Sequence, residues 1–141
     1  GPEAYATLDL ALDLLARLYP AVDVIPLGSD SVGHTLASRL HDVARRINPA
    51  IEGGVTFVPG TAAALVVGKT QAPWDSTATP TLYIGSDGWL VRVSSDHPVG
   101  SGNSTNPFGA GAAACVGAAN MFRAVFGAQL LRSDLDFASG A

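Results

Sequence analysis

The chain has 141 residues but only one cysteine and one methionine, and charged residues make up only 14% of it. A single cysteine excludes a framework of disulfide bonds within the chain and any zinc site built from several cysteines. The net charge of −4 argues against a nucleic-acid partner and against docking on an anionic membrane. Because 48% of the residues are hydrophobic, the chain can bury the core of one folded domain.

Amines are also scarce, since Lys69 is the only lysine. Any mechanism that needs a lysine must therefore use this residue. We expect no secretory signal, because no basic segment followed by an apolar one opens the chain, and the lone thiol fits a cytoplasmic protein. We interpret residues 1–2 as a remnant of protease cleavage after expression, residues 3–132 as a single domain, and residues 133–141 as a weakly ordered tail.

Hydrophobic periodicity predicts three helices, over residues 4–18, 31–47 and 107–130. Short β-rich runs predict strands over residues 21–27, 51–58 and 62–68, and a hairpin over residues 80–94. A helix between the first two strands implies a right-handed parallel crossover, whereas the hairpin adds antiparallel strands. We therefore predict an α/β fold, with a Rossmann-like mixed sheet, an antiparallel hairpin and helices packed on the sheet.

The most distinctive segment is a glycine-rich loop that leads into the last helix, with Thr105 or Asn106 as the helix cap and Pro107 at the first helical position. Backbone N–H groups and the helix dipole favour an anion at such a place. The loop is therefore a candidate anion cradle, formed by Gly102, Ser104, Thr105 and Asn106. The spacing of Gly109, Gly111 and Ala114 matches the dinucleotide fingerprint, but a helix cap stands where that motif needs a strand.

Close packing is the alternative interpretation of the same helix. Small residues recur every four positions in two neighbouring rows, formed by Gly109, Ala113 and Gly117 and by Ala110, Ala114 and Ala118. Each glycine weakens the helix by up to ~1 kcal/mol relative to alanine, and close approach of another element is a sensible compensation. We predict that these rows pack tightly, either within the fold or at an interface with a partner.

Few side chains are candidates for catalysis or metal binding. Cys115 suits a nucleophile or a thioester carrier only if it is exposed beside a positive charge, and neither condition is visible locally, so we expect a buried, inert thiol. His34 and His41 lie two turns apart without a third ligand nearby, so we predict no metal site. His97 precedes a proline in a loop, and we expect it to be solvated. The sequence contains no nucleophile elbow, and we predict no catalytic residue.

Both tryptophans lie in or next to loops. We expect Trp74 to cover the core as a lid, with a contact to a partner as the alternative. Trp89 begins a strand of the predicted hairpin, and we expect it to lie in the core.

Two stretches of the chain form a pattern that resembles a known family. In Tyr83–Phe126, an asparagine-proline-glycine entry at residues 106–109 leads into a small-residue helix that ends in an aromatic and a basic residue. Leu40–Ile51 has the form of a helix-to-strand step. Together these stretches, roughly half of the chain, resemble bacterial ThiF-type adenylyltransferases, which are relatives of ubiquitin-activating enzymes.

In that family two related halves pack together, and only one half needs to bind ATP. The nucleotide-binding half begins with a strand that runs into a glycine-rich loop, whereas here Gly28 is the only turn glycine before Asp30. The paired zinc-binding cysteines of the family are also absent. The resemblance therefore implies a degenerate, non-adenylating N-terminal half, a pseudoenzyme domain without a cofactor. ATP and Mg²⁺ are expected only in an active partner half.

Three functions follow from these observations. The first is a non-catalytic scaffold that packs against an active adenylation domain and contacts a ubiquitin-like or other protein substrate. The second is a stand-alone homo-oligomerisation or protein-binding module, whose small-residue rows form a homodimer. The third is a small nucleotide- or anion-binding enzyme domain that uses the loop over residues 100–106.

Overall fold

The computed structural model describes residues 1–28, 31–54 and 63–132. Its elements follow one another as α1 (Pro2–Leu18), α2 (Ser31–Ile47), β1 (Ala64–Val67), β2 (Thr81–Asp87), β3 (Leu90–Ser94) and α3 (Pro107–Arg132). All three helices agree with the predicted ranges to within two residues at each end. In α3, the side-chain Oδ1 of Asn106 accepts the backbone N–H of Phe108 at 3.1 Å, which confirms the predicted cap.

The three strands form one mixed sheet in the order β1-β2-β3. β1 pairs with β2 in parallel, with Ala64 opposite Thr81, and β2 pairs with β3 in antiparallel fashion, with Tyr83 opposite Ser94. The predicted hairpin and the strand predicted over residues 62–68 are therefore confirmed. The fold is mixed α/β, as expected.

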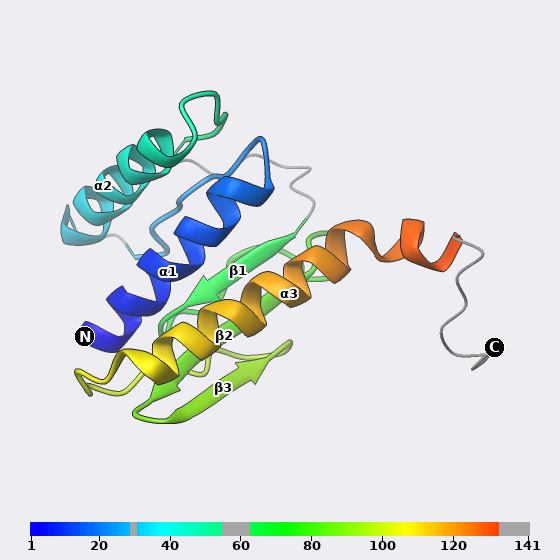
Figure 1. Ribbon diagram of the computed structural model, residues 1–141. Coiled ribbons are helices and arrows are strands. Elements are labelled where there is room, and N and C mark those ends of the chain that lie inside the picture. Colours follow the sequence, from blue (N-terminus) through cyan, green and yellow to red (C-terminus); the bar gives the residue numbers. More distant parts are fainter. Residues whose placement is uncertain (29–30, 55–62, 133–141) are drawn as a thin grey trace.

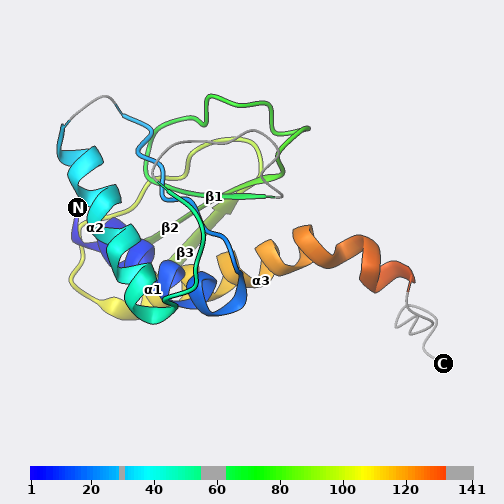
Figure 2. The ribbon, with the colours of Figure 1, turned by 90° about the horizontal axis from the view of Figure 1, so that it is seen from above.

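Helices α1 and α3 contact each other and the sheet, and α2 packs against α1. Figure 2 shows the helices gathered on one side of the sheet and the long loops on the other. On the loop side, Val66, Ala72 and Tyr83 form a small buried cluster. The hydroxyl of Tyr83 accepts the backbone N–H of Ala72 at 3.2 Å, which ties the loop to the sheet.

The predicted strand over residues 21–27 is wrong as an element of this sheet. The segment is joined to residues 52–54 by one parallel bridge, Ala21 to Glu52, and by backbone hydrogen bonds from Val22 and Val24. A Rossmann-like arrangement requires this segment within the sheet, and the structure does not place it there. The second half of the strand predicted over residues 51–58, the turn residues 29–30 and the predicted tail over 133–141 lie outside the described residues.

Within the described part of the chain, residues 107–127 form the one helix long and apolar enough to cross a membrane by length and composition. One face of this helix is covered by the fold, because Ala110, Ala113 and Ala114 are fully buried. α3 therefore serves as a core helix of this domain. Its outer face remains open, and Figure 1 shows the helix lying across the front of the sheet.

Candidate functional site

The thiol of Cys115 is exposed on the outer face of α3. Residues three and four positions away are its neighbours on the helix surface. These neighbours are Gly111, Ala112, Ala118 and Ala119, so no side chain larger than a methyl group flanks the sulfur along the helix. A protein-sized reaction partner can therefore reach this sulfur.

The expectation of a buried Cys115 was wrong. The core-facing rows of α3 begin at Gly109 and Ala110, and both rows are buried as far as Gly117 and Ala118. At about 100° per residue, Cys115 falls outside both rows. All residues of this stretch are small or apolar, so the sequence carried no polar stripe to show which face would be outside.

The charge around Cys115 is simple. Within the described residues, no hydrogen bond or ion pair involves this thiol. α3 contains no acidic residue, so no carboxylate of this helix repels a thiolate. Arg123 is an exposed cation eight residues farther along the same helix row. Arg123 therefore lies about 12 Å farther along the helix axis than Cys115, too far to pair with the thiol directly.

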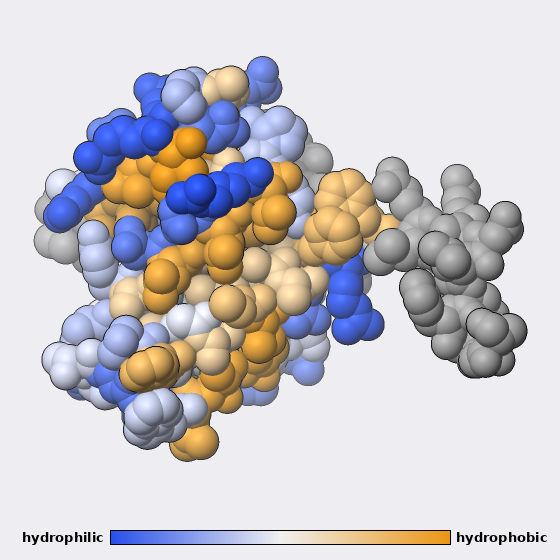
Figure 3. Space-filling model, in the orientation of Figure 1, coloured by the Kyte–Doolittle hydropathy of each residue, from blue (hydrophilic) through white to orange (hydrophobic). Residues whose placement is uncertain are grey.

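Apolar side chains continue this surface on both sides of the thiol. Val116 and Phe122 of α3 and Leu10 of α1 are between 37% and 43% exposed, and Leu10 lies beside Gly111. Figure 3 shows the resulting hydrophobic band over α1 and α3. We call the surface formed by Leu10, Gly111, Ala112, Cys115, Val116 and Ala119 the thiol face.

The predicted anion cradle is occupied by bonds within the chain. The backbone N–H of Gly102 donates to the carbonyl oxygen of Ser86 at 2.8 Å, and that of Asn106 donates to Oγ of Ser104 at 3.0 Å. Thr105 is exposed. The carboxylates of Glu3 and Asp87 face Gly102, since an added Cβ there would lie 2.8 Å and 2.5 Å from their oxygens. Two carboxyl groups therefore lie at this loop, and the anion cradle stays a prediction.

The small-residue rows of α3 pack inside the chain. A Cβ added to Gly109 would overlap the backbone carbonyl oxygen of Gly88, in the turn between β2 and β3. A Cβ added to Gly117 would lie 2.9 Å from Cδ1 of Ile84 and 3.0 Å from Cδ1 of Leu65. The close approach in this structure is thus between the helix and its own sheet.

The two tryptophans have different environments. Trp74 is half-buried, and its Nε1–H donates to Oγ1 of Thr81 at 2.9 Å. The ring packs against the buried cluster of Val66, Ala72 and Tyr83. The expectation that Trp89 lies in the core was wrong, because its side chain is 74% exposed. Trp89 instead stacks on Phe108 at the start of α3, with ring centroids 5.1 Å apart. Trp89 can be exposed because it lies in the turn between β2 and β3 rather than in a strand.

The predicted histidines do not come together as a metal site. His34 is exposed, whereas His41 is buried in the same helix, and among the described residues no three potential ligands form a metal-binding group. His97 is exposed in its loop and lies 3.1 Å from Oγ of Ser94 through Nδ1.

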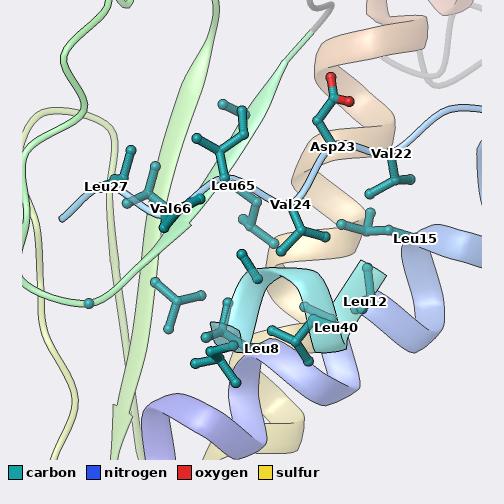
Figure 4. Close-up of a pocket in the computed structure, with 18 of the residues that line it drawn as sticks. Leu8, Leu12, Leu15, Val22, Asp23, Val24, Leu27, Leu40, Leu65 and Val66 are labelled. Carbon is teal, nitrogen blue, oxygen red and sulfur yellow. The ribbon is translucent and has the colours of Figure 1, made fainter. Parts of the chain in front are cut away.

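A cavity that we did not predict lies between the sheet and the first two helices. It has a volume of about 600 Å³ and separates β1 from the segment over residues 21–28 (Figure 4). Most of its lining is aliphatic, but Asp23 and Lys69 also line it. Tyr19 lies at its wall, where burial raises the pKa of the phenol. The only feature of the sequence that pointed to this cavity was Lys69, the single lysine, which directly follows the strand predicted over residues 62–68.

Comparison with known proteins identifies the family. The family model described as prokaryotic E2 family C matches residues 1–127. The protein named y4jF of Sinorhizobium fredii (strain NBRC 101917 / NGR234) is 47% identical over 134 residues, which are 95% of this chain and 25% of that protein. The chain thus spans about a quarter of the length of this relative.

These matches overturn the resemblance to ThiF-type adenylyltransferases, and with it the function of a degenerate scaffold half and the pseudoenzyme interpretation. The two alternative functions, an oligomerisation module and a nucleotide- or anion-binding domain, stay predictions, because a family match does not test them. The features behind the resemblance are the cap at Asn106 and the small-residue rows, which here serve helix initiation and packing. Such features recur wherever a helix lies close to a sheet. The chain belongs to prokaryotic E2 family C.

Proposed function

We propose that this domain is the E2-like module of a bacterial ubiquitin-like-protein conjugation system and that Cys115 carries the modifier as a thioester. An E2 reaction needs a cysteine sulfur, and this chain contains only one. The observation that carries the proposal is the position of that sulfur, which is exposed in the middle of the thiol face.

The proposed step is an exchange of thioesters. The Cys115 thiolate attacks the carbonyl carbon of a modifier that is held as a thioester on an activating enzyme. A carbon–sulfur bond forms to Cys115, the bond to the first sulfur breaks, and that sulfur leaves as a thiolate. The proton of Cys115 passes to solvent. No atom is oxidised or reduced, and the step requires no cofactor or metal.

The domain presents the thiol and leaves other parts of the chemistry to its partner. Cys115 lies in the middle of α3, where the backbone N–H groups are engaged in helix hydrogen bonds and are not available to a developing oxyanion. Among the described residues, no histidine or carboxylate forms a hydrogen bond or ion pair with the thiol. We therefore assign the oxyanion donors and any base to the protein that docks on the thiol face.

The surroundings of the thiol fit a protein partner. The thiol face is apolar, and a docking protein would exclude water from the reacting atoms. We place the reaction in the cytoplasm, because a lone thiol stays reduced there.

The test uses the full-length protein that contains this domain, tagged and expressed in the bacterium that encodes it. The protein is purified without reductant and its mass is measured before and after treatment with dithiothreitol. We expect a protein-sized adduct that dithiothreitol removes. In Cys115→Ser the adduct should become an ester that resists dithiothreitol but not hydroxide, and in Cys115→Ala it should be lost.

Two outcomes would contradict the proposal. One is the absence of a thiol-sensitive adduct on the wild-type protein under these conditions. The other is an adduct that persists unchanged in Cys115→Ala, since it would then be held by a different residue of the longer protein. Circular dichroism of both variants controls for folding, which should be unchanged because the replaced side chain is exposed.

A further inference from the structure

The cavity between β1 and the segment over residues 22–27 has the form of a gap between two strands. We call this space the strand slot, bounded by residues 22–27 on one side and Ala64–Lys69 on the other. In Figure 1 and Figure 4 the two segments run in the same direction, and Leu65, Val66, Val24 and Leu27 lie around the gap. The two segments are not paired with each other, since no β-bridge joins residues 22–27 to β1.

Both sides of the strand slot offer backbone groups for a new strand. The N–H of Ala64 donates to the carbonyl oxygen of Pro80, so the backbone groups of Ala64 point toward β2. Backbone groups alternate in direction along a strand, so those of Val66 also point toward β2. Those of Leu65 and Val67 point the other way, toward the slot. No described backbone hydrogen bond closes on this edge of β1. Unpaired edges of this kind are templates for strand addition.

The segment over residues 22–27, on the other side of the slot, also has alternating backbone directions. The N–H groups of Val22 and Val24 donate to Glu52 and Gly54, each at 2.8 Å, on the side away from β1. Backbone groups alternate in direction along an extended chain, so those of Asp23 and Ile25 turn toward the slot. A strand that enters the slot can therefore bond on both of its edges. A fatty chain has no such donors and acceptors.

Charge gives the inserted strand a direction. The slot is aliphatic except for Asp23, whose carboxylate accepts the backbone N–H of Gly54 at 2.8 Å, and Lys69, which follows β1. Cγ and Cε of Lys69 lie 3.3 Å and 3.4 Å from the position of an added Cβ on Gly100, so the stem of the side chain rests against this glycine. Among the described residues Lys69 has no ion pair. A parallel strand in the slot would end beside Lys69, which follows β1 by two positions and lines the same cavity.

We infer that the strand slot binds an extended apolar peptide that ends in a free α-carboxylate, added as a parallel strand between β1 and residues 22–27, with the carboxylate on Lys69. β1 has four residues, so a peptide of about four or five residues fills its length. This site is separate from the proposed thioester chemistry, because Cys115 lies on the exposed face of α3, whereas Met121 and Val125 of that helix line the slot.

The experiment measures binding of a fluorescein-labelled peptide, Thr-Val-Leu-Val-Gly, to the whole chain by fluorescence anisotropy. The peptide is used as the free acid, as the C-terminal amide, and as an acid that is N-methylated at every second residue. We expect the acid to bind about fivefold more tightly than the amide, since one partly exposed ion pair is lost. The N-methylated acid should not bind, because N-methylation removes backbone donors.

Two variants separate the charge effect from unfolding. In Lys69→Gln the acid and the amide should bind equally, at the affinity that the wild-type chain shows for the amide. In Arg46→Gln, which removes an exposed cation of α2 that does not line the slot, the preference for the acid should persist. Circular dichroism of both variants should match that of the wild-type chain.

Three results would overturn the inference. The first is equal binding of acid and amide to the wild-type chain, and the second is full binding of the N-methylated peptide. The third is saturable binding of dodecanoate when neither peptide binds, since the space would then accept an aliphatic carboxylate rather than a strand. None of these results bears on the Cys115 adduct, so the two proposals stand or fall separately.

Discussion

The carboxylate of Glu3 accepts the backbone N–H of Gly88 at 2.7 Å and thereby joins the first turn of α1 to the turn between β2 and β3. The two residues are 85 positions apart in the chain. Glu3 is only 1% exposed, and its second oxygen, Oε2, has no hydrogen-bond partner among the described residues. Because this carboxyl group is buried, its hydrogen bond to Gly88 is important for stability.

Removal of the Glu3 side chain should destabilise the domain. We expect Glu3→Ala to lower the free energy of unfolding by about 1–3 kcal/mol, because the half-buried N–H of Gly88 loses its acceptor. Glu3→Gln keeps an acceptor oxygen for this N–H, so it should lower the free energy of unfolding less. Urea denaturation measures both values, and equal stability of Glu3→Ala and the wild-type chain would contradict the prediction.

Two glycines of α3 provide a matched pair. Gly109→Ala should destabilise the domain by about 1–3 kcal/mol, since its Cβ would overlap the carbonyl oxygen of Gly88 and the backbone must shift. Gly111→Ala should stabilise it by up to ~1 kcal/mol, because its Cβ would meet only Cδ1 of Leu10, at 3.8 Å, and alanine favours the helix. Thermal unfolding of both variants checks the opposite signs.

The stacked rings of Trp89 and Phe108 should contribute to stability despite their exposure. A double-mutant cycle with Trp89→Ala and Phe108→Ala should give a coupling of about 0.5–1.5 kcal/mol in the free energy of unfolding. The two rings lie nearly parallel, with an angle of 11° between their planes. A coupling indistinguishable from zero would show that the rings do not interact in solution.

Cys115 should react readily with N-ethylmaleimide in the folded protein, because its thiol is exposed. The control places the only thiol at the adjacent position, in the double variant Cys115→Ala and Ala114→Cys. Ala114 is fully buried, so modification of that thiol waits for opening of the helix and should be more than about tenfold slower. Similar rates at the two positions would contradict the orientation of α3.

Asp75 should titrate below the ordinary range of an aspartate. The backbone N–H of Thr77 donates to its Oδ1 at 2.9 Å, and hydrogen bonds from Thr77 lower the pKa of this carboxyl group. A lowered pKa adds stability above the pKa of the unfolded chain, and this stability is lost as the pH falls through the folded value. NMR titration should give a midpoint that rises in Thr77→Val, and an unchanged midpoint would contradict the role of the Thr77 hydroxyl.

Much of the fold follows from local patterns. The leucine periodicity of α1, the cap at Asn106 and the turn at Gly88 predicted their elements because each depends on near neighbours in the chain. Residues 21–27 have the composition of a strand, but a strand also needs a partner. Their hydrogen bonds go to residues 52–54, and the strand slot separates them from β1. Such pairing depends on distant residues that no local pattern describes.

The candidate sites were harder to predict for a different reason. The sequence around Cys115 is small and apolar on every side, so helical periodicity could not distinguish the covered face from the open one. The orientation of α3 follows from the contact between Gly109 and the carbonyl of Gly88, which joins two distant parts of the chain. The aromatic ring of Trp89 suggested burial, but its place in the hairpin turn directs it onto Phe108 instead.

The single lysine has a consequence for a protein that handles activated carboxyl groups. Lysine ε-amines are the usual acceptors of ubiquitin-like modifiers, and a conjugation protein rich in them would consume its own product by self-modification. This domain exposes one such amine, at the end of β1, and replaces the other surface cations with arginines, whose guanidinium groups stay protonated. If both proposals hold, a carboxylate that pairs with Lys69 also covers this amine, and the domain is then a poor target for its own reaction.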